Sequence, residues 1–249
     1  MFKVLERIFK DKLATESISL AGSDRFRGPI EGTASEAVLA ACQAACPVKC
    51  FSAQGEAYSI DYRKCLFCGR CVEACAKVAL VDGTEPGLKH RHEDAMPYLI
   101  EAGKEALQDV LKEKLGRSLH VRHLDAGSCN ACDFEMGATG NPYYDLARYG
   151  VHFVASPRHA DLLMITGVVT RNLETALKMS YEAMPEPRLV MACGACAAGG
   201  ETYGDTYAVV GAADQVVPVD LYVPGCPPRP SAMIVALLAA ADMLKEKMK

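Results

Sequence analysis

This sequence lacks three features: a membrane-spanning segment, a basic block of the kind that binds nucleic acid, and the apolar core of a signal peptide. No apolar run reaches the about 20 residues that a membrane-spanning helix needs; the best candidate, Ala232–Leu244, reads as a buried terminal helix that ends among lysines. No long basic block is present and the formal net charge is −4, so nucleic acid is not an expected partner. The segment Met1–Leu13 has no apolar core of a signal peptide, so we expect a cytoplasmic chain.

Cysteine, in contrast, is abundant: 12 of the 249 residues. In a reducing compartment such thiols stay reduced, and closely spaced ones are more typical of metal ligands than of disulfides. Cys65, Cys68, Cys71 and Cys75 form a C-x2-C-x2-C-x3-C run. Three thiolates at this spacing bind one corner of an iron–sulfur cubane, whereas zinc usually takes two separated pairs. The run therefore predicts an iron–sulfur site whose fourth ligand comes from elsewhere.

A second segment, Cys42-Gln-Ala-Ala-Cys46-Pro47, makes the first third of the chain resemble a bacterial two-cluster ferredoxin. The resemblance implies one 4Fe-4S cluster on four thiols, called the ferredoxin set below: Cys46, Cys65, Cys68 and Cys71. A second cluster would lack two ligands, because Glu36 and Leu39 stand where such ferredoxins have cysteines. The remaining thiols, Cys42, Cys50 and Cys75, would form an incomplete extra site or pack as inert small hydrophobes.

The rest of the chain alternates short apolar strands with helices, which is typical of a parallel sheet covered by helices on both faces. The expected strands are 118–125, 151–155, 162–166, 188–191 and 219–222, and the expected helices include 172–184 and 230–247. Cysteines follow several of these strands. Because sites in open α/β folds gather at the carboxyl ends of strands, these dispersed thiols are expected to converge.

Four ordered motifs in this region carry a second resemblance. They are Gly127-Ser-Cys129-Asn-Ala-Cys132-Asp-Phe-Glu135, Ser156-Pro-Arg-His-Ala-Asp161, Gly194-Ala-Cys196-Ala-Ala-Gly-Gly200 and Val223-Pro-Gly-Cys226-Pro-Pro. Together they resemble the small, proximal-cluster subunit of membrane-bound (energy-converting) nickel–iron hydrogenases, which is homologous to the 20 kDa iron–sulfur subunit of respiratory complex I. Complex I subunits usually carry two adjacent cysteines where this chain has Cys129-x2-Cys132, so the spacing favours a hydrogenase.

This resemblance implies a flavodoxin-like domain that holds a single 4Fe-4S cluster. Its ligands would be four thiols, called the proximal set below: Cys129, Cys132, Cys196 and Cys226. Cys193 has no place in that pattern and would be packed or lie near the cluster. Glu135, Arg158 and His159 would either tune the cluster and face a partner, or form plain interface salt bridges.

The two resemblances together predict a fused chain. Residues 1–85 would form an N-terminal helix and a ferredoxin-like α+β domain with a 4Fe-4S cluster. Residues 86–115 would form a linker helix, and residues 116–249 the α/β, flavodoxin-like domain of the hydrogenase small subunit. Two 4Fe-4S clusters are therefore expected, with a third, incomplete one as an option on Cys42, Cys50 and Cys75.

The expected function is electron transfer within a multi-subunit nickel–iron hydrogenase, with no catalytic residue in this chain. Expected partners are a nickel–iron large catalytic subunit, a ferredoxin-like or other electron donor, and membrane subunits that hold the complex on the cytoplasmic side of a membrane. The alternative is the cluster subunit of a complex I-like oxidoreductase whose partner reduces quinone or another acceptor without nickel. A free electron carrier and a structural zinc protein are the remaining alternatives.

Overall fold

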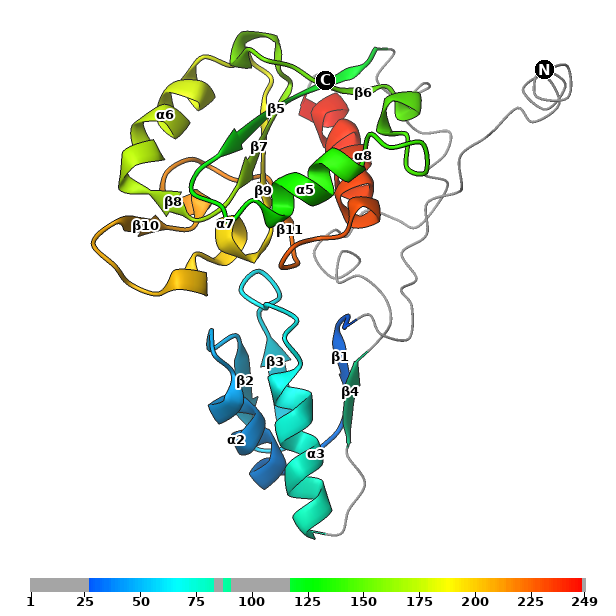
Figure 1. Cartoon of the computed structure of the whole chain (residues 1–249), viewed down its shortest axis with the longest axis vertical. Coiled ribbons are helices and arrows are strands. Elements are labelled where there is room, and N and C mark those ends of the chain that lie inside the picture. Colours follow the sequence, from blue (N-terminus) through cyan, green and yellow to red (C-terminus); the bar gives the residue numbers. More distant parts are fainter. Residues whose placement is uncertain (1–26, 83–86, 91–116, 248–249) are drawn as a thin grey trace, which may run out of the picture.

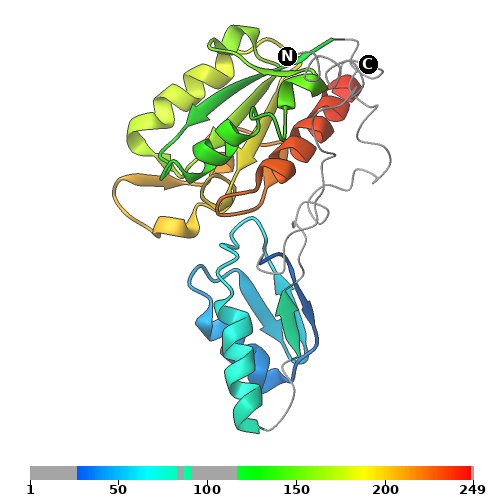
Figure 2. The ribbon, with the colours of Figure 1, turned by 45° about the vertical axis from the view of Figure 1, so that its right-hand side comes forward.

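The structure, a computed structural model, describes residues 27–82, 87–90 and 117–247, which form a small and a large domain (Figure 1). The predicted N-terminal helix lies outside these residues, and so does the predicted linker helix apart from residues 87–90. Figures 1 and 2 show the large domain above the small one, with the chain between β3 (Ala57–Ile60) and α3 (Arg70–Asp82) reaching up to it. Within the described residues, no helix combines the length and the apolar character needed to cross a membrane.

The small domain consists of two antiparallel strand pairs and two helices. Its elements are β1 (Ile30–Gly32), α2 (Glu36–Ala45), β2 (Phe51–Gln54), β3, α3 and β4 (Leu88–His90). β1 pairs with β4 and β2 with β3, and the core between them and the helices includes Leu39, Phe51 and Leu88. This part of the chain therefore has the α+β character that the sequence predicts. The pairing of β4 carries this domain to His90, beyond the expected boundary at residue 85.

The large domain is built on a five-stranded parallel sheet in the order β11-β9-β7-β5-β6. Its elements are β5 (Leu119–Asp125), α5 (Ala131–Ala138), η2 (Leu146–Tyr149), β6 (Val151–Phe153), η3 (Pro157–His159), β7 (Leu162–Thr166), β8 (Val169–Thr170), α6 (Arg171–Glu182), β9 (Leu189–Cys193), α7 (Ala195–Gly199), η4 (Glu201–Tyr203), β10 (Val209–Gly211), η5 (Ala213–Gln215), β11 (Leu221–Val223) and α8 (Pro230–Lys247). β8 and β10 form a separate antiparallel pair. The predicted flavodoxin-like α/β fold is confirmed.

Helices cover both faces of the sheet. The central strand β7 is apolar at almost every position, so its side chains need a buried environment on either face. In β7, Leu162 and Met164 join the core beneath α8, while Leu163 and Ile165 join the core beneath α6. These four side chains are fully buried. Burying an aliphatic side chain of this size stabilises a fold by about 1.5–3 kcal/mol relative to leaving it exposed. The continuous apolar run, rather than an alternating one, is what specifies a buried parallel strand.

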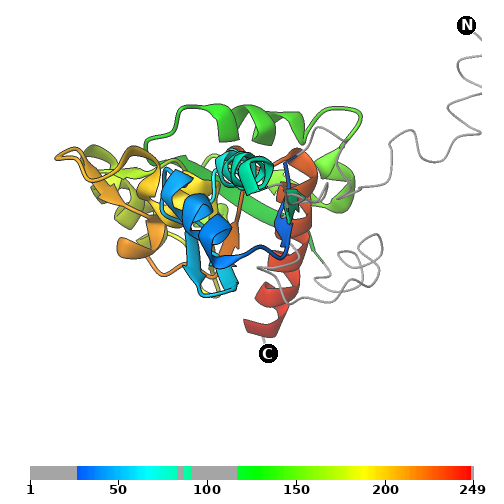
Figure 3. The same ribbon diagram turned by 90° about the horizontal axis from the view of Figure 1, so that it is seen from below.

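All five strands run in one direction, so their carboxyl ends share one edge of the sheet. The observed strands overlap the five predicted ranges, and β7 matches its prediction at both ends. The loops after β5, β9 and β11 leave from this shared edge. Figure 3, seen from below, shows the small domain in front of the same edge. The fold therefore directs every cysteine-bearing loop of the large domain toward the small domain.

Candidate iron–sulfur sites

The proximal set is assembled from three loops at the carboxyl edge of the sheet. Cys129 follows β5 and Cys132 lies in α5, Cys196 lies in α7 directly after β9, and Cys226 follows β11. Two backbone hydrogen bonds join the last two loops, from the Gly194 amide to the Val223 carbonyl and from the Ala195 amide to the Gly225 carbonyl, both at 2.8 Å. The parallel sheet thus brings together thiols that are almost a hundred positions apart.

The four thiols lie close together, because they contribute to one another's raised pKa values. The pKa of Cys132 is raised to about 12, mainly by burial and to a smaller extent by the neighbouring thiols of Cys196 and Cys226. Burial, followed by Cys196 and Cys129, raises the pKa of Cys226 to about 11. Cys132 and Cys196 are buried, whereas Cys129 and Cys226 are exposed. Thiols gathered in this way ionise together only if positive charge compensates them, and the iron of a cubane supplies that charge.

Gly194 makes room for this arrangement. Its φ is +88°, and a Cβ built on it would lie 2.7 Å from Cys132 Sγ. A side chain at this position would therefore occupy space that belongs to the thiol. The close approach of backbone to thiol is what a compact cluster cradle requires.

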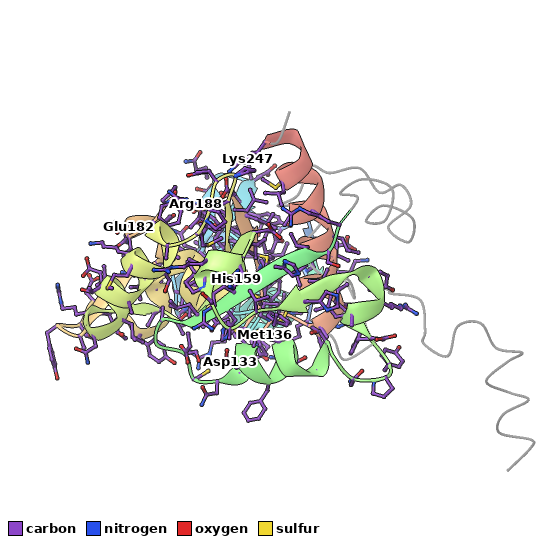
Figure 4. The ribbon with its side chains drawn as sticks, turned by 90° about the horizontal axis from the view of Figure 1, so that it is seen from above. Asp133, Met136, His159, Glu182, Arg188 and Lys247 are labelled. Atoms are coloured by element: carbon purple, nitrogen blue, oxygen red, sulfur yellow. The ribbon has the colours of Figure 1, made fainter. Side chains whose placement is uncertain are left out.

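A polar network holds the Cys129–Cys132 loop from behind, and the sequence did not predict it. Asp133 Oδ1 lies 3.0 Å from His123 Nε2 and accepts a hydrogen bond from the Thr166 hydroxyl at 3.1 Å. Asp125 accepts hydrogen bonds from the backbone amides of Gly127 and Ser128 at 2.8 and 2.7 Å. Burial lowers the pKa of His123 in spite of the nearby carboxylates. Figure 4 labels Asp133 on α5. The one available signal was Asp133 itself, a charged residue directly beside a ligand position.

Cys193, which has no place in the proximal pattern, is the last residue of β9 and belongs to the apolar core of the sheet. Burial raises the pKa of its thiol well above the ordinary value, with smaller contributions from Cys132 and Asp133. It therefore packs directly behind the proximal set. This position fits a small buried hydrophobe next to the cluster site.

In the small domain, five thiols line one largely apolar pocket: Cys46, Cys50, Cys65, Cys68 and Cys71. All four members of the ferredoxin set are among them. Burial, followed by the neighbouring Cys65 and Cys68, raises the pKa of Cys71 to about 11. The donor set, its mutual approach and its apolar walls fit a 4Fe-4S cluster, and the ligand assignment itself stays a prediction.

Cys50 lies in this pocket and not with Cys42 and Cys75. Its Sγ is 3.4 Å from Cys46 Sγ. A hydrogen bond with Cys65 raises the pKa of Cys50, and the same bond lowers the pKa of Cys65. Of the two thiols, Cys65 therefore loses its proton more easily. The optional grouping of Cys42, Cys50 and Cys75 is not brought together by the structure.

Cys42 and Cys75 instead form a pair between α2 and α3, where both are fully buried. Burial, followed by Cys75 and Cys71, raises the pKa of Cys42 to about 12, and the two thiols share a hydrogen bond. Both belong to the core of the small domain. Their environment is that of packed thiols.

We predict that Cys50→Ala keeps the ferredoxin-domain cluster whereas Cys46→Ala loses it. Four thiols remain in the pocket in either case, but the ferredoxin spacing assigns Cys46 as the fourth ligand. Iron per chain and the paramagnetic resonance signal of the reduced protein measure the outcome. Cys42→Ala is the matched control for a buried thiol outside the pocket. Loss of iron in Cys50→Ala, with retention in Cys46→Ala, would assign the fourth ligand to Cys50 instead.

Of the three residues predicted to tune or face a partner, only Glu135 lies beside a cysteine set, half-buried on α5. Arg158 and His159 lie in η3, which precedes β7 and therefore occupies the amino edge of the sheet. Figure 4, seen from the side opposite the small domain, shows His159 on that side together with Arg188 and Lys247. The structure separates Arg158 and His159 from the proximal thiols, which leaves an interface as their predicted role.

The two cysteine sets approach each other across the domain contact. The pKa of Cys226 is raised mainly by burial and then by the thiols of its own set, and Cys65 and Cys68 of the ferredoxin set make a smaller contribution in the same direction. No three His, Cys, Asp or Glu side chains in the described ranges are placed to hold one single metal ion. The fit to iron–sulfur clusters rests on the number of thiols in each set and on their mutual approach.

Comparison with known proteins supports the second resemblance. The family model described as NADH ubiquinone oxidoreductase, 20 Kd subunit, matches residues 129–240, a range that contains the whole proximal set. A relative from Pyrococcus furiosus, named probable membrane-bound hydrogenase subunit mbhJ, is 44% identical over 135 residues, which are 54% of this chain and 81% of the relative. The chain belongs to the family of this 20 kDa subunit.

Other members of the 20 kDa subunit family bear names from both branches of the prediction. Formate hydrogenlyase subunit 7 of Escherichia coli is 38% identical over 152 residues, 61% of this chain and 60% of the relative. An NADH-quinone oxidoreductase subunit of Citrifermentans bemidjiense is 50% identical over 113 residues, 45% of this chain and 66% of the relative. The chain thus spans less than two thirds of the length of each of these two relatives.

Proposed function

We propose that this chain is the electron-transfer subunit of a multi-subunit nickel–iron hydrogenase complex. The proximal set would hold one 4Fe-4S cluster and the ferredoxin set another. Such clusters, when bound, take up and release single electrons. The thiolates of this chain fix where those electrons reside. The nickel–iron centre that oxidises hydrogen or reduces protons would belong to a partner large subunit.

The observation that carries this proposal is the approach of the two cysteine sets within one chain. Cys226 of the proximal set lies close enough to Cys65 and Cys68 of the ferredoxin set to respond to their charge. Two redox sites that share one domain contact suit the passage of electrons between an outside donor and a partner enzyme. The high coverage of the membrane-bound hydrogenase relative supports the nickel–iron assignment.

The surface beside the proximal set supports a docked large subunit. Cys129 is exposed, and α5, which follows it, presents Phe134 with 79% of its surface exposed. Tyr143, in the segment after α5, is 52% exposed. Exposed aromatic side chains next to a redox site are typical of protein interfaces. We place the chain at the periphery of a membrane complex, held there by partner subunits.

A second candidate function is supported by the relative with the higher identity. At 50% identity, the NADH-quinone oxidoreductase subunit points to a complex I-like oxidoreductase whose partner reduces quinone or another acceptor without nickel. The Cys129-x2-Cys132 spacing favours the hydrogenase, but the proximal geometry serves both functions. The distinction lies in the partner subunit and not in this chain.

We predict hydrogen-dependent viologen reduction by the native complex, purified anaerobically through a tag on this chain, with nickel in a copurifying large subunit. The same preparation under nitrogen is the control. A brown, intact complex without nickel or hydrogen turnover, but with quinone reduction, would support the second candidate. A complex that contains neither iron nor sulfide would contradict both.

A further inference from the structure

The short helix η4 contacts the proximal set and the loop that carries the ferredoxin set with consecutive side chains. Thr202 Oγ1 lies 3.3 Å from Cys196 Sγ. Tyr203 neighbours the same thiols, because Cys196 and Cys129 contribute, after burial, to the raised pKa of its hydroxyl. Glu201 Oε1 lies 2.9 Å from Lys64 Nζ, and Lys64 directly precedes Cys65 of the ferredoxin set. One three-residue element therefore joins two proximal thiols to the ferredoxin-domain loop.

The Lys64–Glu201 ion pair is reinforced by closer packing around it. The backbone oxygen of Arg63 and Cα of Lys64 lie against Gly199, at the end of α7, so closely that a Cβ there would be 2.8 Å from each. The Arg63 guanidinium lies over the Tyr222 ring at 5.6 Å, within cation–π range. A partly exposed ion pair alone stabilises little. With the backbone contact, the pair instead fixes the direction in which the Cys65 loop approaches.

We infer that η4 couples the two cysteine sets, with Thr202 and Tyr203 as hydrogen-bond donors to the proximal thiolates and Glu201 as the residue that docks the ferredoxin-domain loop beside them. The inference rests on the proposed function, since it describes how one chain places two clusters for electron exchange. The transfer moves one electron from one set to the other, with no proton or group, after a one-electron reductant such as a viologen radical has supplied it.

The two hydroxyl groups set the ease with which the proximal cluster accepts an electron. Reduction adds negative charge to a site that already carries four thiolates. A hydroxyl that donates to a thiolate sulfur stabilises the reduced state more than the oxidised state, because hydrogen bonds to charged acceptors strengthen with the charge. Thr202 and Tyr203 therefore raise the reduction potential of the proximal cluster and leave the other cluster unaffected.

The first test is a redox titration of the full chain, with clusters assembled anaerobically, followed by electron paramagnetic resonance. We expect Thr202→Val and Tyr203→Phe each to make the proximal cluster harder to reduce by about tenfold in equilibrium constant, or about 59 mV for one electron. The potential of the ferredoxin-domain cluster stays unchanged. Tyr207→Phe is the matched control, because Tyr207 lies in the same stretch and is 92% exposed.

The second test addresses docking by Lys64 and Glu201. When both clusters are reduced, their unpaired spins interact if the clusters lie close together, and the resonance lines broaden. We expect Lys64→Glu to diminish this broadening by placing two carboxylates opposite each other, and Lys64→Glu with Glu201→Lys to restore it. Lys178→Glu, which disrupts a surface pair with Glu174 on α6 at 2.6 Å, is the matched control and leaves the spectrum unchanged.

The outcomes separate this inference from the function on which it rests. Two clusters in the parent chain, a selective shift in the hydroxyl variants and rescue by the charge swap support the coupling. Two clusters with unchanged potentials in Thr202→Val and Tyr203→Phe, or with broadening insensitive to Lys64→Glu, overturn the coupling and leave the electron-transfer function standing. A parent chain that assembles only one cluster, or none, overturns the proposed function itself.

Discussion

Replacing Gly194 with alanine is expected to abolish the proximal cluster although all four of its thiols remain. The new Cβ would lie 2.7 Å from Cys132 Sγ, well inside van der Waals contact. With φ of +88° and ψ of 157°, Gly194 lies in a backbone region that is essentially restricted to glycine, which adds a cost of about 1–3 kcal/mol for any residue with a side chain. Gly194 cannot relax away, because its amide is bonded to the Val223 carbonyl beside the Cys226 loop. The clash is therefore transmitted to the cluster ligands.

Iron and sulfide analysis of the anaerobically assembled chain measures this result. The parent should hold about eight irons in two 4Fe-4S clusters, and Gly194→Ala about four. The ferredoxin-domain cluster serves as an internal control for folding, since its ligands come from the other domain. Gly137→Ala is the matched control: Gly137 lies in α5 of the same domain, and its added Cβ would meet no neighbouring atom within 4 Å. Full iron content in Gly194→Ala would contradict the proposed cradle.

The sheet and the convergence of the proximal thiols were predictable from the sequence, for a physical reason. A parallel strand buried on both faces must be apolar at successive positions, and 162–166 has that pattern almost from end to end. Once the strands are parallel, the loops that carry Cys129, Cys196 and Cys226 must leave from one edge. Local pattern and topology together were sufficient to bring these thiols to one place.

It was harder to predict from the sequence which of the neighbouring thiols in the small domain lie together. Cys46 and Cys50 are four residues apart, and both point into the same pocket. A spacing rule assigns ligands by position along the chain, but the turn after α2 carries Cys50 into the Cys65 pocket, whereas Cys42 within α2 lies beside Cys75. Spacing alone does not reveal the direction of that turn, so the optional grouping of Cys50 with Cys42 and Cys75 did not anticipate the place of Cys50 in the pocket.

Arg158 and His159 show a different limit. Their motif accompanies the proximal cysteines in sequence, yet the whole of β7 lies between them and the carboxyl edge. Five residues of strand at about 3.3 Å each amount to roughly 16 Å. A resemblance reports that a motif belongs to a family, but the strand direction decides at which edge the motif lies. The residues at the site that belong to none of the four motifs, such as His123 and Thr202, were missed for the converse reason.

The domain contact was the least predictable feature, because it consists of ordinary residues such as Lys64, Glu201 and Gly199. A substitution at this contact nevertheless has the second large effect that we predict. We expect Gly199→Val to leave both clusters assembled but to slow electron exchange between them by roughly tenfold or more. A misplacement of about 1 Å costs up to roughly 100-fold in reactions that depend on oriented groups, and electron tunnelling also falls steeply with separation.

The reason for this effect lies in what the new side chain meets. A Cβ on Gly199 would be 2.8 Å from the Arg63 carbonyl oxygen and from Lys64 Cα, which are backbone atoms of the other domain. Backbone cannot rotate aside as a side chain does, so the Cys65 loop must retreat from the proximal set. Stopped-flow oxidation of the chain after reduction of one cluster measures the exchange rate. Gly137→Val, the same substitution in open space, should leave the rate unchanged; an unaltered rate in Gly199→Val would show that electrons do not cross this contact.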